Sequence, residues 1–214
     1  MRRQTMAITV ITEAILLALL VYGISNWRTY WISTVLLSQV LMLVPLVLEA
    51  KKMILLPWPI VLGASLSLLL HSLGLATEWY FTVFWWDKLT HMTSGVVLST
   101  LVAIEVLLLD LRNESVKIPY IWYLLIVPIA ILTLEGIWEL LEYTIDVVLG
   151  TGMQHGLTDT VNDIATNLIS GIVSGVGVVY YLRRRPVDEF VASLEAERLE
   201  QWFLRRLGKG SRLL

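Results

Sequence analysis

Residues 119–146 read PYIWYLLIVPIAILTLEGIWELLEYTID, a long apolar stretch with four acidic residues in its second half. A helix of about 20 apolar residues crosses the roughly 30 Å hydrocarbon core of a bilayer. This stretch is longer than one crossing requires, so we expect a transmembrane helix that tilts or protrudes from the membrane.

Five further apolar stretches have a suitable length for crossing a membrane, and the composition agrees. The chain is 57% hydrophobic and 16% charged, whereas soluble domains average about 25% charged residues. The sequence therefore predicts an all-α fold, a polytopic helix bundle of about six transmembrane helices in the cell membrane, surrounded by the lipid bilayer. The predicted spans lie near residues 6–25, 30–49, 54–75, 88–109, 119–146 and 159–182.

Lysine and arginine fall mainly on one side of the predicted bundle, and such residues mark the cytoplasmic side. The opposite side holds only Arg28 and Lys88. Both termini are therefore predicted to be cytoplasmic. The basic residues of the cytoplasmic side are Arg2, Arg3, Lys51, Lys52, Arg112, Lys117, Arg183, Arg184 and Arg185.

We divide the chain into a six-helix transmembrane domain, residues 1–185, and a cytoplasmic tail, residues 186–214. The tail mixes apolar and charged residues, which is typical of an amphipathic helix on a membrane surface or of a solvated helix. The net charge is −2, so no nucleic-acid partner is implied. Cysteine is absent, which excludes disulfides and thiolate metal sites.

Acidic residues on the fifth span form one continuous stripe. Glu135, Glu139, Glu142 and Asp146 are separated by four, three and four residues, so they share a helix face. An aspartate at the centre of a transmembrane helix costs roughly 2.5–3.5 kcal/mol. Carboxylates this close repel one another unless a cation or a proton intervenes. The stripe is therefore a candidate functional site.

The fourth and sixth spans present polar residues at the same end of the bundle as this stripe. Asp87 and His91 are four residues apart on the fourth span, and Asp159 and Asp163 are four apart on the sixth. Asp87 has an alternative role as a helix N-cap. Gly171 and Gly175 continue the face of the sixth span, where we expect close helix packing. His155 lies in the connecting loop.

Imidazole and several carboxylates together suit a divalent metal ion. We assign His91, Glu139 and Asp163 as metal ligands. The helix N-termini at this end favour an anion such as phosphate. The first hypothesis is therefore a membrane enzyme that acts on a lipid or lipid-linked phosphate at the extracytoplasmic side. Its catalytic residues would be Asp87, Glu135, Glu142 and Asp159.

Two other functions fit the same residues. Intramembrane carboxylates with a histidine also build proton relays, which suggests a proton-coupled transporter or permease. Polar groups can also hold helices together by about 0.6–2 kcal/mol per bond, as in a membrane scaffold or accessory protein. The scaffold explains the polar groups but not the excess of acids.

Three sequence blocks resemble the YjdF-like bacterial and archaeal membrane proteins, a family without settled activity. The blocks are WDKLTHMTSG at 86–95, EGIWELLE at 135–142 and DTVNDIATN at 159–167. More distantly, they are similar to VanZ-like proteins. The resemblance implies a multi-pass membrane protein and covers roughly residues 80–180. The matching polar positions are Asp87, His91, Glu139, Glu142, Asp159 and Asp163.

Overall fold

The computed structural model describes residues 3–26, 28–112, 117–150, 153–184 and 187–196. These residues form helices and connecting loops without a β-strand, and six helices are long and apolar enough to cross a membrane. The predicted all-α bundle of six spans is confirmed. The long helices are α1 (Arg3–Ser25), α2 (Thr29–Ala50), α3 (Trp58–Ala76), α5 (Trp86–Arg112), α6 (Tyr123–Leu149) and α7 (Leu157–Leu182).

Three short helices complete the fold: α4 (Trp79–Thr82), the 3₁₀ helix η1 (Tyr120–Trp122) and α8 (Val187–Ser193). Helix α3 begins at Trp58 rather than near residue 54, where we predicted its start, because Pro57 disfavours helical backbone in the residue before it. Helix α6 ends at Gly150, whose φ of 64° is the left-handed conformation that terminates many helices.

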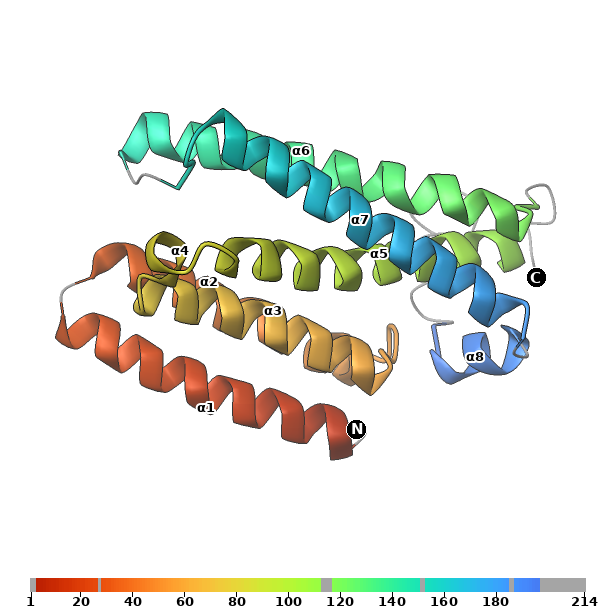
Figure 1. Ribbon diagram of the computed structural model, residues 1–214. Coiled ribbons are helices and arrows are strands. Elements are labelled where there is room, and N and C mark those ends of the chain that lie inside the picture. The colour runs from red at the N-terminus through yellow and green to blue at the C-terminus, as the bar shows by residue number, and fades with distance from the viewer. Residues whose placement is uncertain (1–2, 27, 113–116, 151–152, 185–186, 197–214) are drawn as a thin grey trace.

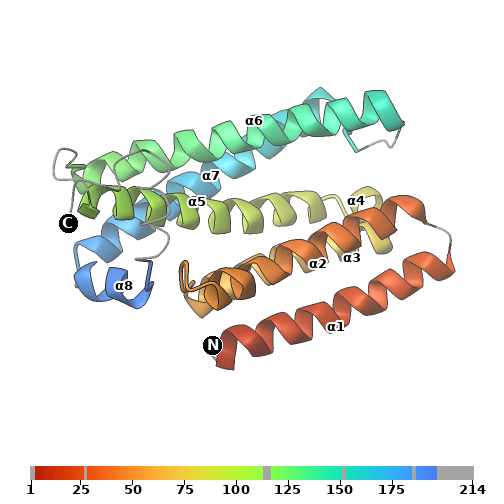
Figure 2. The same cartoon turned by 180° about the vertical axis from the view of Figure 1, so that it is seen from behind.

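The long helices form two groups, α1 to α3 and α5 to α7, which meet where α3 packs on α5. Figures 1 and 2 show both groups from opposite sides. The start of α5, the end of α6 and the start of α7 lie at one end of the bundle, which we call the site end (Figure 1). The start of α1 and helix α8 lie at the other end.

Hydroxyl groups connect the helices of the first group. Thr12 Oγ1 lies 2.5 Å from Ser65 Oγ, which links α1 to α3. The Ser72 hydroxyl donates to Ser38 Oγ at 3.2 Å, which links α3 to α2. Such interhelical bonds satisfy polar groups that lipid leaves without partners, so they fix the relative rotation of the three helices.

Glycines allow α7 to approach its neighbours closely. A β-carbon at Gly171 would lie 2.6 Å from Ile131 Cγ2 and 2.9 Å from Pro128 Cα, and one at Gly175 would lie 3.1 Å from the carbonyl oxygen of Tyr123. The predicted packing role of these two glycines is confirmed. The close contact between α6 and α7 aligns their polar residues at the site end.

The described part of the tail packs on the opposite end of the bundle. Leu194 and Ala196 are buried in a cluster with Ile54, Ile104 and Leu108. The amide of Leu55 donates to the carbonyl oxygen of Leu194 at 2.6 Å. Residues 197–214, most of the predicted amphipathic tail, lie outside the described residues, so the division at residue 186 stays a prediction. The cytoplasmic location of both termini also stays a prediction.

We predict that Gly171→Ala destabilises the protein, because the new methyl group would collide with the backbone of α6 at Pro128. Overpacking of this kind typically costs about 1–3 kcal/mol. The measurement is the apparent melting temperature of the purified protein in detergent. Gly177→Ala on the same helix is the matched control, because a β-carbon there meets nothing within 4 Å. Equal melting temperatures for the two variants would contradict the packing role.

Candidate metal and acid site

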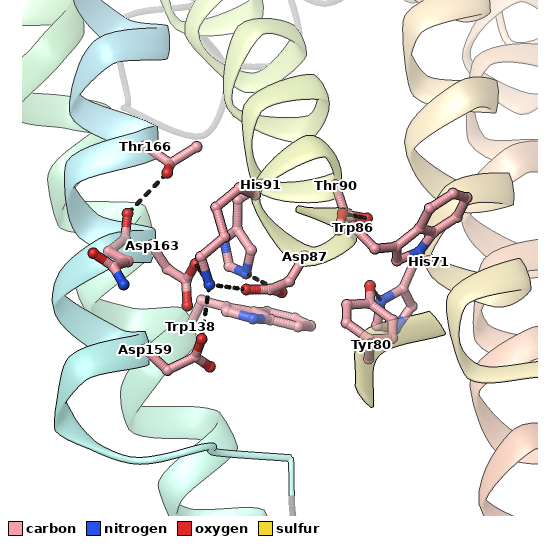
Figure 3. A network of polar contacts seen from close by, with 12 residues as sticks. His71, Tyr80, Trp86, Asp87, Thr90, His91, Trp138, Asp159, Asp163 and Thr166 are labelled. Atoms are coloured by element: carbon pink, nitrogen blue, oxygen red, sulfur yellow. Dashed lines mark hydrogen bonds and ion pairs between the residues drawn. The ribbon is translucent and has the colours of Figure 1, made fainter. Parts of the chain in front are cut away.

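Three helices supply the side chains of the candidate site (Figure 3). Asp87, Lys88 and His91 occupy the first turns of α5, and Asp159 and Asp163 occupy the first turns of α7. The acidic stripe of α6 completes it with Glu135, Glu139 and Glu142. A β-carbon at Gly95 would collide with Asn167, so this glycine lets α7 lie close to α5.

His91 lies between two carboxylates from different helices. Its Nε2 atom is 3.4 Å from Asp87 Oδ1, and its Nδ1 atom is 3.0 Å from Glu135 Oε1. The side-chain amide of Asn167 lies 3.1 Å from Nδ1. Asp87 and His91 thus lie on one face of α5, as their spacing predicts. Contacts at both ring nitrogens fix the orientation of the imidazole.

Lys88 contacts three aspartates at once. Its Nζ atom lies 2.8 Å from Asp87 Oδ2, 2.7 Å from Asp159 Oδ1 and 3.4 Å from Asp163 Oδ1. The lysine side chain remains 31% exposed, so it lies at the rim of the site. His155 adds a second contact to Asp159, with Nδ1 and Oδ2 separated by 3.2 Å.

The other acids of the stripe have neutral hydrogen-bond donors. The Thr160 hydroxyl donates to Glu139 Oε2 at 2.7 Å, and Trp138 Nε1 donates to Glu142 Oε1 at 2.8 Å. Asp146 accepts from the amides of Met153 and Gln154, at 2.7 and 2.9 Å. Asp146 therefore stabilises the loop between α6 and α7.

Three deeply buried carboxylate oxygens lack a hydrogen-bond partner among the described residues. They are Glu135 Oε1, Glu139 Oε1 and Asp163 Oδ1, in residues that are 6%, 7% and 2% exposed. Leaving a polar group buried and unsatisfied is costly. Glu135 Oε1 lies 3.0 Å from His91 Nδ1, and Asp163 Oδ1 lies 3.4 Å from Lys88 Nζ. The oxygens of Glu139 and Asp163 therefore have the most capacity left for a bound cation.

Three side chains of this cluster are close enough together to hold a metal ion. One ligand atom each from Asp87, His91 and Asp163 lie within 4.8 Å of one another. The structure thus brings together two of the three predicted ligands, His91 and Asp163, and adds Asp87, which we had predicted as catalytic. The group does not include Glu139, whose role as a ligand stays a prediction, as do the catalytic roles of Glu135, Glu142 and Asp159.

A histidine that the sequence analysis did not consider also lies beside the cluster. His71 of α3 has its Nδ1 atom 2.7 Å from the Tyr80 hydroxyl. Its ring contacts that of Trp138 edge-on, with 6.4 Å between centroids. Figure 3 shows His71 and Tyr80 on the side of Asp87 away from α7. The predicted topology could have indicated this position, because residue 71 lies near the outer end of the third predicted span, at the same end as the acidic stripe.

The fold and this site define a polytopic membrane protein with an acidic and histidine cluster at one end of a helix bundle. Residues 7–184 match the family described as Predicted membrane protein (DUF2238). The chain belongs to this family, and the predicted membership of a multi-pass membrane family without settled activity is confirmed. The distant similarity to VanZ-like proteins stays a prediction. No curated protein and no solved structure gives a significant match.

We predict that Thr160→Val destabilises the protein, because it leaves both oxygens of the buried Glu139 without a donor. Removing such a donor typically costs about 1–3 kcal/mol. The measurement is the melting temperature in detergent. Thr158→Val, an exposed position in the same helical turn, is the isosteric control. The difference should shrink in a Glu139→Leu background, which removes the acceptor, since the two residues share one interaction. A loss that is unchanged by Glu139→Leu would argue against this bond.

Proposed function

We propose that this protein is a divalent-metal-dependent membrane enzyme that acts on a lipid or lipid-linked phosphate. The observation that carries the proposal is the meeting of Asp87, His91 and Asp163, whose ligand atoms lie within 4.8 Å. Two carboxylates and one imidazole form the mixed oxygen and nitrogen set that zinc and manganese accept. The unsatisfied oxygen of Asp163, in a residue only 2% exposed, supports a cationic ligand.

The residues around the donor set have distinct roles in this proposal. Glu135, 3.0 Å from His91 Nδ1, orients the imidazole so that Nε2 faces Asp87, as carboxylates commonly orient metal-binding histidines. Glu142 and Asp159 are the acids that would hold or accept a proton during the reaction. Glu139 could supply an additional metal ligand, because its Oε1 atom has no hydrogen-bond partner among the described residues. When bound, a divalent ion activates water or polarises a phosphoryl oxygen.

The rim of the site suits an anionic headgroup. Lys88 is partly exposed there, and α5 and α7 both begin at this end, where helix dipoles favour negative charge. Neighbouring apolar side chains such as Phe81 and Leu157 are exposed, as expected for contact with lipid. The distribution of lysine and arginine places this rim on the extracytoplasmic side in our proposal.

Metal binding tests the proposal first. We expect the purified wild-type chain to bind about one Mn²⁺ or Zn²⁺, and both His91→Ala and Asp163→Ala to weaken binding by at least about 100-fold, because each removes a direct ligand and loss of a residue that only supports a ligand already costs about 10–100-fold. Isothermal titration and metal analysis after dialysis measure this. Glu105→Gln, an exposed acid on the same helix, is the charge-matched control. Wild-type protein without stoichiometric metal would remove the proposal.

Catalysis is tested separately from metal binding. Purified protein in vesicles that contain lipid monophosphates or diphosphates should release phosphate only when Mn²⁺ or Zn²⁺ is present. His91→Ala should abolish this release, while Glu105→Gln should retain it. If the protein binds one metal ion but releases phosphate from none of these lipids, the site binds metal and the proposed enzymatic activity is contradicted.

A proton-coupled transporter is the second candidate, and one observation favours it. Asp87, His91 and Glu135 form a consecutive chain of contacts that leads into the bundle, as in proton relays. Asp110, the buried acid near the opposite end, accepts from the amide of Ile118 and so has a separate hydrogen-bond partner from this chain of contacts. Uptake driven by a pH gradient in liposomes, lost in Glu135→Gln, would favour the transporter.

A further inference from the structure

Lys88 and the candidate metal ligands share the same carboxylates. We propose that the Lys88 ammonium is a tethered counter-cation that competes with the divalent ion, so that metal binding displaces it toward the rim. This inference rests on the proposed metal site and adds a control of its affinity. Two of the three carboxylates that Lys88 contacts, those of Asp87 and Asp163, also belong to the metal-binding group.

The two oxygens of the Asp87 carboxylate contact different side chains. Oδ1 lies 3.4 Å from His91 Nε2, and Oδ2 lies 2.8 Å from Lys88 Nζ. A metal ion bound by Asp87, His91 and Asp163 would therefore lie next to the ammonium group. Two cations this close repel strongly where water is scarce, so the contacts of Lys88 with Asp87 and Asp163 weaken when the ion binds.

The Lys88 side chain can move toward the rim when these contacts weaken. Its side chain is 31% exposed and already lies 2.7 Å from Asp159, which is more exposed than Asp163. A lysine has a flexible four-carbon stem and a compact charge, so it can move while its backbone stays fixed. The displaced ammonium would remain beside Asp159 and His155 at the rim, where an anionic headgroup could bind it.

The contact with Asp163 is the weakest of the three and supports displacement. Asp163 Oδ1 is 3.4 Å from Nζ, and this oxygen has no hydrogen bond among the described residues although the residue is 98% buried. An ammonium at the rim thus satisfies the deepest carboxylate incompletely. A small divalent ion bound by Asp87, His91 and Asp163 would satisfy it directly.

The first experiment titrates Mn²⁺ into the purified full chain and three variants. Lys88→Met should bind Mn²⁺ roughly tenfold or more tightly than wild type, because the competing charge is gone. Lys88→Arg should bind with an affinity within about threefold of wild type or weaker. Lys52→Met removes the same charge at the opposite end of the bundle, so it should leave the affinity unchanged. Size-exclusion chromatography and circular dichroism establish that each variant is folded.

The second experiment uses only the wild-type chain, so it does not depend on the folding of a variant. An acylating reagent modifies free lysine amines, and mass spectrometry follows the rate at Lys88 with Lys52 as the internal reference. Saturating Mn²⁺ should raise the relative rate at Lys88 several-fold, because fewer carboxylates hold the amine.

The outcomes separate this inference from the proposed function. If wild type binds Mn²⁺ but Lys88→Met binds no more tightly and the labelling rate does not rise, the inference is overturned and the metal site stands. If only Lys88→Met binds Mn²⁺, the competition stands and the proposed function of the natural chain fails. If neither binds Mn²⁺, both are overturned.

Discussion

The compensation of buried negative charge is the constraint on which the rest of this structure depends. Asp87, Glu135, Glu139 and Asp163 lie where three helices meet, and water is scarce there. Lys88 contacts Asp87, Asp159 and Asp163, and the His91 ring contacts Asp87 and Glu135. Glu139 accepts a hydrogen bond from Thr160. An uncompensated charge in such a place is costly. The cluster persists because Lys88 and His91 each contact more than one acid, and the buried oxygens without hydrogen bonds suit a divalent ion.

Small and hydroxyl-bearing residues make the helix contacts that bring these groups together. Glycines at positions 95, 171 and 175 let α7 lie against α5 and α6, so the polar first turns of α7 reach the acidic stripe. The first three helices connect through hydroxyl groups, and α3 adds His71 beside the cluster. Helix assembly and the acidic cluster therefore depend on different sets of residues.

Much of this arrangement could be predicted from residue spacing. The lengths of the apolar stretches predict six helices. Because successive helices cross the bundle in alternating directions, Asp87, the α6 stripe and Asp163 are predicted at the same end. The individual partners could not be predicted, because helix rotation and tilt depend on packing. Residue spacing does not distinguish Glu139 from Asp87 as a metal ligand. In the structure, α6 is rotated so that Glu139 accepts a hydrogen bond from Thr160, and Asp87 is the acid that lies beside His91. His71 escaped prediction because no acid accompanies it along the chain.

The most direct test of the central claim is the position of a bound ion. A crystal structure of the protein grown with Mn²⁺ and measured for anomalous scattering would locate the metal independently of any assay. We expect one peak at about 2.0–2.3 Å from oxygens of Asp87 and Asp163 and from a ring nitrogen of His91. A well-ordered site end without such a peak, with Lys88 still on the three aspartates, would contradict it.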